Sequence, residues 1–266
     1  MARYFVNNLG IFITNKCNLN CDHCLRGKKN DQDIKNEVID EIFNQIIGVG
    51  VLDICGGEPL LALDKIEYLF NKIIEKKIYI QTIAITINGT IYSERCEALF
   101  DKINEYLKAT SGGNIIFAVS LDKYHQKEMK RLGIDYNYDF LKSKYFLMYR
   151  ELDEKLKLFR EGNAENLSES ETLPLRAMPP IICDLGNKYK SISHIIGPYL
   201  CINTNGTITE DNTSIEKQEA IYNYGNILNG DLVETLQSKG FKTYKSEALY
   251  NLAAERKLKR YMTYNK

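Results

Sequence analysis

The segment LGIFITNKCNLNCDHC, residues 9–24, joins a short apolar run to three closely spaced cysteines. LGIFIT, residues 9–14, predicts a β-strand, because short runs of apolar, β-branched and aromatic residues are typical of buried strands. Cys17, Cys21 and Cys24 follow with the spacing C-x3-C-x2-C, on the loop beyond this strand. The spacing alone leaves three interpretations open: an iron–sulfur cluster held by three thiolates, a zinc site completed by a histidine, or a redox-active C-x2-C pair.

The number and crowding of the cysteines favour the metal-site interpretations over a disulfide framework. The seven cysteines are an odd number and three are crowded together, which in a reducing compartment favours a metal site over a disulfide framework. We expect Cys55 and Cys96 to pack in the core. In the zinc interpretation, His23 or His125 is the candidate histidine ligand.

The chain has no feature of a secreted or membrane-bound protein. The N-terminus lacks a signal-peptide pattern and no apolar run approaches a membrane span, so we expect a cytoplasmic protein without a membrane partner. The 35 basic and 35 acidic residues cancel, which gives no electrostatic reason to expect a nucleic-acid partner.

The first half of the chain alternates between helical and strand periodicity. After the first strand we predict a helix over 37–50, a strand over 51–55, a helix over 64–77 capped by Asp64, a strand over 79–87, a helix over 94–109 and a strand over 114–121. Such alternation with short connections predicts an α/β fold with a parallel sheet, wound as a barrel or left open.

Polar and cysteine groups gather where these strands end. The three cysteines follow the first strand, and GGEP, residues 56–59, follows the second. Asn88 follows the third strand, and Ser120 and Asp122 mark the end of the fourth. Ligands of parallel α/β folds bind at the carboxyl ends of the strands. We therefore expect these groups to face one common site.

The periodicity weakens in the second half of the chain. Residues 138–156 predict a long helix, and residues 231–261 predict a helical stretch with an interruption at Gly240. Residues 199–211 predict a β-hairpin, because Asn205-Gly206 stands between two alternating runs.

C-x3-C-x2-C after the first strand, together with GGEP after the second, resembles the radical S-adenosylmethionine (radical SAM) superfamily. The resemblance implies a partial (β/α) barrel of parallel strands. It also implies that Cys17, Cys21 and Cys24 ligate one four-iron four-sulfur (4Fe-4S) cluster. Three thiolates leave one iron without a protein ligand, and SAM would chelate that iron through its amine and carboxylate.

The resemblance also implies how the GGEP segment acts and what chemistry results. Gly56, Gly57, Glu58 and Pro59 match the motif, whose glycines let the backbone approach SAM closely and hold its ammonium group. One electron from the cluster would cleave SAM to methionine and a 5′-deoxyadenosyl radical, which abstracts a hydrogen atom from the substrate.

Four further residues match family positions around SAM. His23 stands where the family usually has an aromatic residue whose backbone contacts the adenine. Ser120, Asp122 and, less closely, Asn88 match strand-end positions that often reach the ribose or the methionyl part of SAM. For these three, capping of the strand end is the alternative that the sequence leaves open.

The C-terminal region resembles a SPASM or twitch extension, which in peptide-modifying relatives binds extra clusters. The hairpin over 199–211 and the following YGNIL carry this resemblance, and they divide the chain into a core over 1–170 and an extension over 171–266. Cys183 and Cys201 cannot supply a full set of cluster ligands. We therefore predict one cluster, and an extension that keeps the hairpin and helices without metal.

These expectations combine into a radical SAM enzyme that abstracts a hydrogen atom from a ribosomally made peptide, with a flavodoxin- or ferredoxin-type protein as reductant. Only about ten residues precede the first predicted strand, so we expect a peptide substrate to need a separate leader-recognition partner. Two alternatives remain: a radical SAM enzyme acting on a small metabolite (nucleoside, sugar or amino acid), and a zinc-binding interaction protein without catalysis.

Overall fold

A parallel β-sheet forms the centre of the molecule. The computed structural model describes residues 3–150, 157–175, 177–186 and 192–245. Neighbouring strands of the sheet run parallel and follow chain order: β1 (Tyr4–Thr14), β2 (Ile46–Gly56), β3 (Tyr79–Ile87), β4 (Asn114–Ser120) and β5 (Phe146–Arg150). The predicted α/β class and the partial barrel of parallel strands are confirmed.

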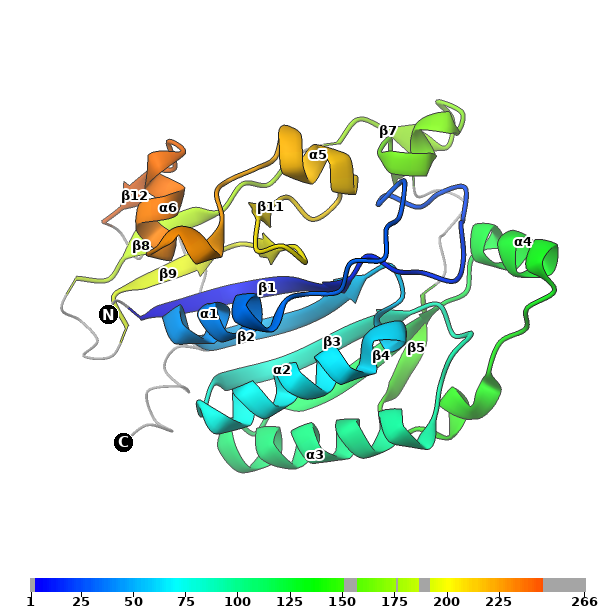
Figure 1. The fold of residues 1–266 in the computed structure, drawn as a ribbon, viewed down its shortest axis with the longest axis horizontal. Coiled ribbons are helices and arrows are strands. Elements are labelled where there is room, and N and C mark those ends of the chain that lie inside the picture. The colour runs from blue at the N-terminus through cyan, green and yellow to red at the C-terminus, as the bar shows by residue number, and fades with distance from the viewer. Residues whose placement is uncertain (1–2, 151–156, 176, 187–191, 246–266) are drawn as a thin grey trace.

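Three helices cover one face of this sheet (Figure 1): α1 (Asn36–Gln45), α2 (Leu63–Glu75) and α3 (Glu94–Thr110). Each helix buries an apolar stripe against the strands, which in α2 consists of Ile66, Leu69, Phe70 and Ile73. The main hydrophobic core therefore lies between the helices and the sheet, and it fixes the positions of the strand ends.

Several elements lie close to their predicted bounds. The strand predicted over 79–87 coincides with β3, and the helix predicted over 94–109 differs from α3 by one residue. The predicted cap of α2 is wrong, because Ala62 occupies the cap position and Asp64 lies in the first turn.

The predicted helix over 37–50 is wrong in its second half. α1 ends at Gln45, and Ile46 begins β2, so the strand predicted over 51–55 is the end of a strand of 11 residues. The run IIGVG has helical spacing, but β-branched residues and glycines are poor helix formers. Pairing with β1 on one side and β3 on the other satisfies its backbone groups.

The predicted helix over 138–156 is also wrong. The 3-10 helix Tyr138–Lys142 is followed by β5, while residues 151–156 lie outside the described residues. The rings of Phe140 and Phe146 pack 5.5 Å apart. The edge of β4 offers unpaired backbone groups, which a strand satisfies and a helix does not.

The C-terminal part of the chain adds strands to the same sheet. β8 (Ile181–Asp184) is antiparallel to β9 (His194–Gly197), and β9 and β10 (Leu200–Ile202) each pair in parallel with β1. β10 and β11 (Ile208–Thr209) form the predicted hairpin around Asn205-Gly206.

The remaining elements are short. They are β6 (Leu158–Phe159), which pairs with β7 (Thr172–Leu173), then α5 (Ile215–Ala220), α6 (Leu232–Ser238) and β12 (Thr243–Tyr244). Of the helical stretch predicted over 231–261, α6 is the described part, and residues after 245 lie outside the described residues. The division at residue 170 stays a prediction. Among the described helices, none has the length and apolar character needed to cross a membrane.

The face of the sheet opposite the helices carries small and polar side chains. Along β2 and β3, core residues alternate with Asp53, Cys55, Ala84 and Thr86, which are only partly buried. Strand pairing sets such residues in rows, so that Gly10 of β1 lies beside Asp53, and Asp53 beside Ala84. This face is the inner wall of the partial barrel, and it leads to the loops at the strand ends.

Candidate functional site

One cavity lies at the carboxyl ends of β1 to β4 and continues along the inner wall of the barrel. Its volume is about 410 Å³. The loop after β1 (Figure 1) carries the three cysteines and contributes them to the lining of this cavity. The predicted site residues that line the cavity are Cys17, Cys21, His23, Cys24, Gly56, Gly57, Asn88, Ser120 and Asp122. The structure thus brings these residues together, and Glu58 and Pro59 lie buried beside them.

The cysteine loop rests on the GGEP segment through backbone contacts. The Gly57 N–H donates to the Thr14 carbonyl (2.9 Å), and the Glu58 N–H donates to the Lys16 carbonyl (2.7 Å). A Cβ atom on Gly57 would lie 2.1 Å from the Lys16 carbonyl oxygen, and one on Gly56 would lie 2.4 Å from that of Thr14. Because only glycine allows this approach, the two glycines fix where the cysteine loop starts.

The three cysteines fit a site for thiolate-bound metal. Burial raises the pKa of the Cys17 thiol and raises that of Cys21 to about 12, although Lys29 has the opposite effect. A bound metal supplies the positive charge that buried thiolates need. Three thiols on one loop in one cavity match the ligand set of a 4Fe-4S cluster with one open iron.

A turn from the second half of the chain holds the cysteine loop from outside. This turn is the 3-10 helix Gly162–Asn166. The Asn163 N–H donates to the Cys24 carbonyl (2.9 Å), and its side-chain amide donates to the Cys21 carbonyl (3.0 Å). A Cβ atom on Gly162 would lie 2.5 Å from the Leu25 carbonyl oxygen. This contact was not predicted from the sequence, because Gly162-Asn163 indicates only a turn.

Glu58 links the ends of two strands and does not line the cavity. Its carboxylate accepts hydrogen bonds from the Leu60 N–H (3.1 Å) and from the Asn88 N–H (2.7 Å). The side chain is 1% exposed, and burial raises its pKa to about 7 even though both N–H groups favour the charged form. Pro59 begins the 3-10 helix that carries the chain from β2 into α2.

Asn88 connects the end of β3 to the cysteine loop. Its side-chain amide donates to Asn18 (2.8 Å) and lies 3.9 Å from the Cys17 sulfur, while its oxygen accepts from the Thr90 N–H (3.0 Å). The carbonyl of Ser120, at the end of β4, accepts from the Tyr136 hydroxyl (3.1 Å). Capping of the strand end is therefore confirmed for Asn88, and a contact with SAM stays a prediction for both residues.

Asp122 caps α4 (Lys123–Leu132) and binds two histidines. Its carboxylate accepts from the backbone N–H groups of Tyr124 (2.9 Å) and His125 (3.1 Å). It also lies 2.6 Å from His125 Nδ1 and 3.5 Å from His23 Nε2. Although burial opposes ionisation, the hydrogen bonds with the two histidines hold the pKa of Asp122 well below its usual range. Most of its hydrogen-bonding capacity is thus used within the protein.

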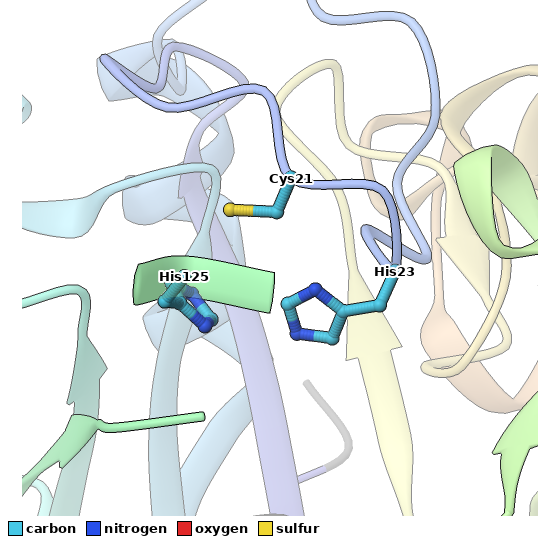
Figure 2. Close-up of side chains that lie close together, drawn as sticks. All are labelled: Cys21, His23 and His125. Atoms are coloured by element: carbon cyan, nitrogen blue, oxygen red, sulfur yellow. The ribbon is translucent and has the colours of Figure 1, made fainter. Parts of the chain in front are cut away.

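Cys21 also belongs to a second set of metal-binding side chains. Figure 2 shows Cys21, His23 and His125 facing one another, and their ligand atoms all lie within 4.8 Å of each other. The His23 ring stacks on Tyr124 at a centroid distance of 4.7 Å. Zinc accepts sulfur and nitrogen donors of this kind, so a metal analysis has to distinguish zinc from iron.

The inner end of the cavity was not predicted from the sequence. It is formed by Arg26, Asp53, Cys55, Tyr199 and Asp211. The prediction that Cys55 packs in the core is wrong, because its neighbours on β2 face the helices and Cys55 faces the inner wall. The strict alternation in VLDIC was the available signal. Cys96, by contrast, is buried in the core as predicted.

Cys183 and Cys201 are buried in separate parts of the sheet. Cys183 lies in the row of Ile195 and Phe5, while Cys201 pairs with Gly10. The two rows are five positions apart along β1, a distance of about 16 Å. This separation is consistent with the prediction of a single cluster.

Comparisons with known proteins identify relatives of this chain. The model of the radical SAM superfamily matches residues 11–144, which is half of the chain. A probable GTP 3′,8-cyclase of Methanococcus maripaludis (strain C6 / ATCC BAA-1332) is 33% identical over 130 residues, covering 41% of this chain and 42% of the relative. GTP 3′,8-cyclase of Alkaliphilus oremlandii (strain OhILAs) is 31% identical over 130 residues, covering 41% and 40%. The matched segment thus spans about two fifths of these relatives.

Two solved structures are similar at low sequence identity. His-tagged anSMEcpe with bound AdoMet is 13% identical, with a TM-score of 0.49 over 97% of this chain and 96% of the other. Streptococcus suis SuiB bound to the precursor peptide SuiA is 14% identical, with a TM-score of 0.42 over 87% and 64%.

Substituting Gly57 tests the backbone contact beneath the cysteine loop. In Gly57→Ala the new Cβ would overlap the Lys16 carbonyl and lie 2.9 Å from Cys17 Cβ, so we expect a loss of about 3 kcal/mol in unfolding free energy and poor retention of iron. The control Gly112→Ala has open space and pays only for its left-handed backbone, about 1 kcal/mol. Urea unfolding and iron content are measured on both. Equal effects in the two variants would contradict the proposed role of Gly57.

The pH dependence of stability tests the burial of Glu58. Because its pKa is raised to about 7 in the folded state, the folded protein binds a proton more tightly than the unfolded chain. Wild type should therefore lose about 3 kcal/mol relative to Glu58→Gln as the pH rises from 4 to 8. Unfolding free energies are compared across this range, with the exposed Glu105→Gln as control. A difference independent of pH would mean that Glu58 has the same pKa in the folded protein as in the unfolded chain.

Proposed function

The chain belongs to the radical SAM superfamily, an enzyme family whose cofactors are a 4Fe-4S cluster and SAM. We propose that its cavity is the site where a hydrogen atom is abstracted from a substrate. The observation that carries the proposal is the position of three thiols beside the GGEP backbone in one cavity. When bound, the cluster and SAM supply a reductive cleavage that yields a 5′-deoxyadenosyl radical. A flavodoxin- or ferredoxin-type protein is the proposed electron donor.

The residues of this chain bind and orient the cofactors. Cys17, Cys21 and Cys24 are the proposed cluster ligands. The backbone of Gly56-Gly57 is the proposed contact of the SAM ammonium group, since no side chains obstruct it. The cysteine loop is held on one side by GGEP and on the other by the Gly162–Asn166 turn, and these contacts fix the position of its thiols.

Side chains at the remaining strand ends complete the proposed SAM site. The backbone of His23 is the proposed contact of the adenine, and the stacking of its ring on Tyr124 supports this by fixing the loop at this point. Asn88, Ser120 and Asp122 line the same cavity and are proposed to border the ribose and methionyl parts. Asp122 acts mainly through its contacts with His23 and His125, because these hold the wall of the cavity in place.

A ribosomally made peptide is the first proposed substrate. The segment after the β10–β11 hairpin contributes Asp211 and Asn212 to the cavity, so the hairpin region shapes the inner end. A volume of about 410 Å³ lies toward the small end of ligand pockets. If SAM occupies part of it, one side chain of a peptide can enter while the rest stays outside. A separate leader-recognition partner would then hold the peptide.

A small metabolite is the second candidate, and the curated relatives favour it by their name, GTP 3′,8-cyclase. Their match covers about two fifths of their length, so the name transfers only as a proposal. The cavity lining does not select for or against a triphosphate, since it carries both signs of charge: Asp53 and Asp211 together with Arg26, Lys29 and Arg150. A nucleoside, sugar or amino acid is therefore the proposed class of metabolite.

Metal content and SAM cleavage test the proposed function together. After anaerobic reconstitution we expect about four irons per chain, and 5′-deoxyadenosine when a reductant and SAM are added. Both should be lost in the variant that combines Cys17→Ala, Cys21→Ala and Cys24→Ala, while the control that combines Cys183→Ala and Cys201→Ala keeps both.

Other results would contradict parts of the proposal. About eight irons would mean a second cluster. About one zinc per chain, without iron and without SAM cleavage, would assign the site to the Cys21, His23 and His125 set and remove the enzymatic function.

A further inference from the structure

The inner end of the cavity lies further down the strands than Cys17, Cys21 and Cys24 and has a charge pattern of its own. Asp53 precedes Gly56 by three residues on β2, so it lies about 10 Å further from the carboxyl end of the strand. Both positions line the same cavity. If SAM binds at Gly56-Gly57, as proposed above, the inner end is the space that remains for the substrate.

A glycine in β1 makes room for the side chain that positions Asp53. Gly10 pairs with Asp53 on one side and with Cys201 on the other. A Cβ atom on Gly10 would lie 3.1 to 3.2 Å from the ring and hydroxyl of Tyr199, and 2.8 Å from the Cys201 sulfur. The phenol thus crosses β1 above Gly10 and donates a hydrogen bond to Asp53 Oδ2 (2.7 Å). This bond orients the Asp53 carboxylate, and no hydrogen bond from a described residue occupies its Oδ1.

The Asp53 carboxylate forms no direct ion pair with a described residue, and Arg150, which lines the same cavity, acts on it only at longer range. Among the described residues, no Lys, Arg or His nitrogen lies within 4.0 Å of it. Arg26 is engaged elsewhere: it pairs with Asp211 (3.0 Å), donates to the Thr213 carbonyl (3.1 Å) and lies over the Phe12 ring. Burial raises the pKa of Asp53, although the hydrogen bond from Tyr199 has the opposite effect. A partly buried carboxylate of this kind is stabilised by a cationic hydrogen-bond donor.

We propose that Asp53, positioned by Tyr199, binds a cationic amine or guanidinium group of the substrate at the inner end of the cavity. This inference rests on the proposed function and specifies its substrate class. The binding point lies about 10 Å along β2 from Gly56, so several methylene groups or a sugar-sized unit fit between the cation and SAM. Small neighbours on the inner wall, such as Ala84 in the row of Asp53, leave space for them.

The cation can come from two sources with the same chemistry. One is the lysine or arginine side chain of a peptide, and the other is a free amine or guanidine metabolite. A phosphate or carboxylate group would not be bound by Asp53 itself, because both carry negative charge.

Binding of matched probes tests the proposal on the reconstituted protein with SAM present. The probes are agmatine and L-arginine as free metabolites, N-acetyl-arginine amide as a peptide mimic, and L-citrulline as the neutral isostere of arginine. Affinities are measured by calorimetry, independently of catalysis. We expect at least one cationic probe to bind about tenfold or more tightly than L-citrulline. One charge-assisted hydrogen bond accounts for a difference in affinity of this size.

Three variants locate the charge preference. Asp53→Asn keeps the shape of the side chain and should bind the cationic probes and L-citrulline about equally. Tyr199→Phe should lower the preference for the cationic probes only partly, because the carboxylate remains. The exposed Asp135→Asn serves as control and should keep the full preference. Preference for the arginine amide identifies a peptide source, and preference for agmatine or free arginine identifies a metabolite; either result supports the shared chemistry.

Several outcomes would overturn the inference. These are equal binding of arginine and citrulline in wild type, an unchanged preference in Asp53→Asn, or no binding of any cationic probe up to about 10 mM. The proposed function is tested separately by 5′-deoxyadenosine formation. Cleavage of SAM without a charge preference overturns this inference alone, and a charge preference without cleavage overturns the proposed function.

Discussion

The approach of two backbone segments at the ends of β1 and β2 determines the rest of the site. At Gly56 and Gly57 the chain passes so close to residues 14–16 that a single added carbon would overlap a carbonyl oxygen. Two hydrogen bonds fasten the contact. Because both strands belong to a sheet covered by helices, the cysteine loop begins from a rigid base. Glu58 extends the contact to β3, and the Gly162–Asn166 turn closes the loop from outside.

The two faces of the sheet have different tasks. The face toward the helices is apolar and supplies the main core, whereas the inner wall carries small or polar residues and leaves a cavity. This arrangement costs stability, since Asp53 and Glu58 are desolvated and their pKa values rise. Functional sites commonly carry such perturbed groups. The inner wall therefore buries less apolar surface and leaves space for ligands. The apolar surface buried between the helices and the other face of the sheet stabilises the fold.

Sequence patterns predicted the parallel sheet and the common location of the strand-end residues, because apolar runs and strand-end motifs are local features. They failed where tertiary pairing overrides periodicity, as at residues 46–50 of β2 and at β5. They also missed the inner end of the cavity. Alternation within VLDIC separates Asp53 and Cys55 from the core residues, but which face is covered by helices depends on the whole fold. The contact between Tyr199 and Asp53 joins residues 146 positions apart, and it requires the β1–β10 register.

The central claim is that three cysteines leave one iron of the cluster open toward the cavity at Gly56-Gly57. Electron paramagnetic resonance of the reduced, reconstituted protein, recorded with and without SAM, tests it most directly. If one iron is open, the spectrum of the reduced cluster shifts when SAM binds, because SAM then becomes a ligand of that iron. An identical spectrum at saturating SAM would contradict the account, since it would mean that the protein ligates every iron or that the cavity does not bring SAM to the cluster.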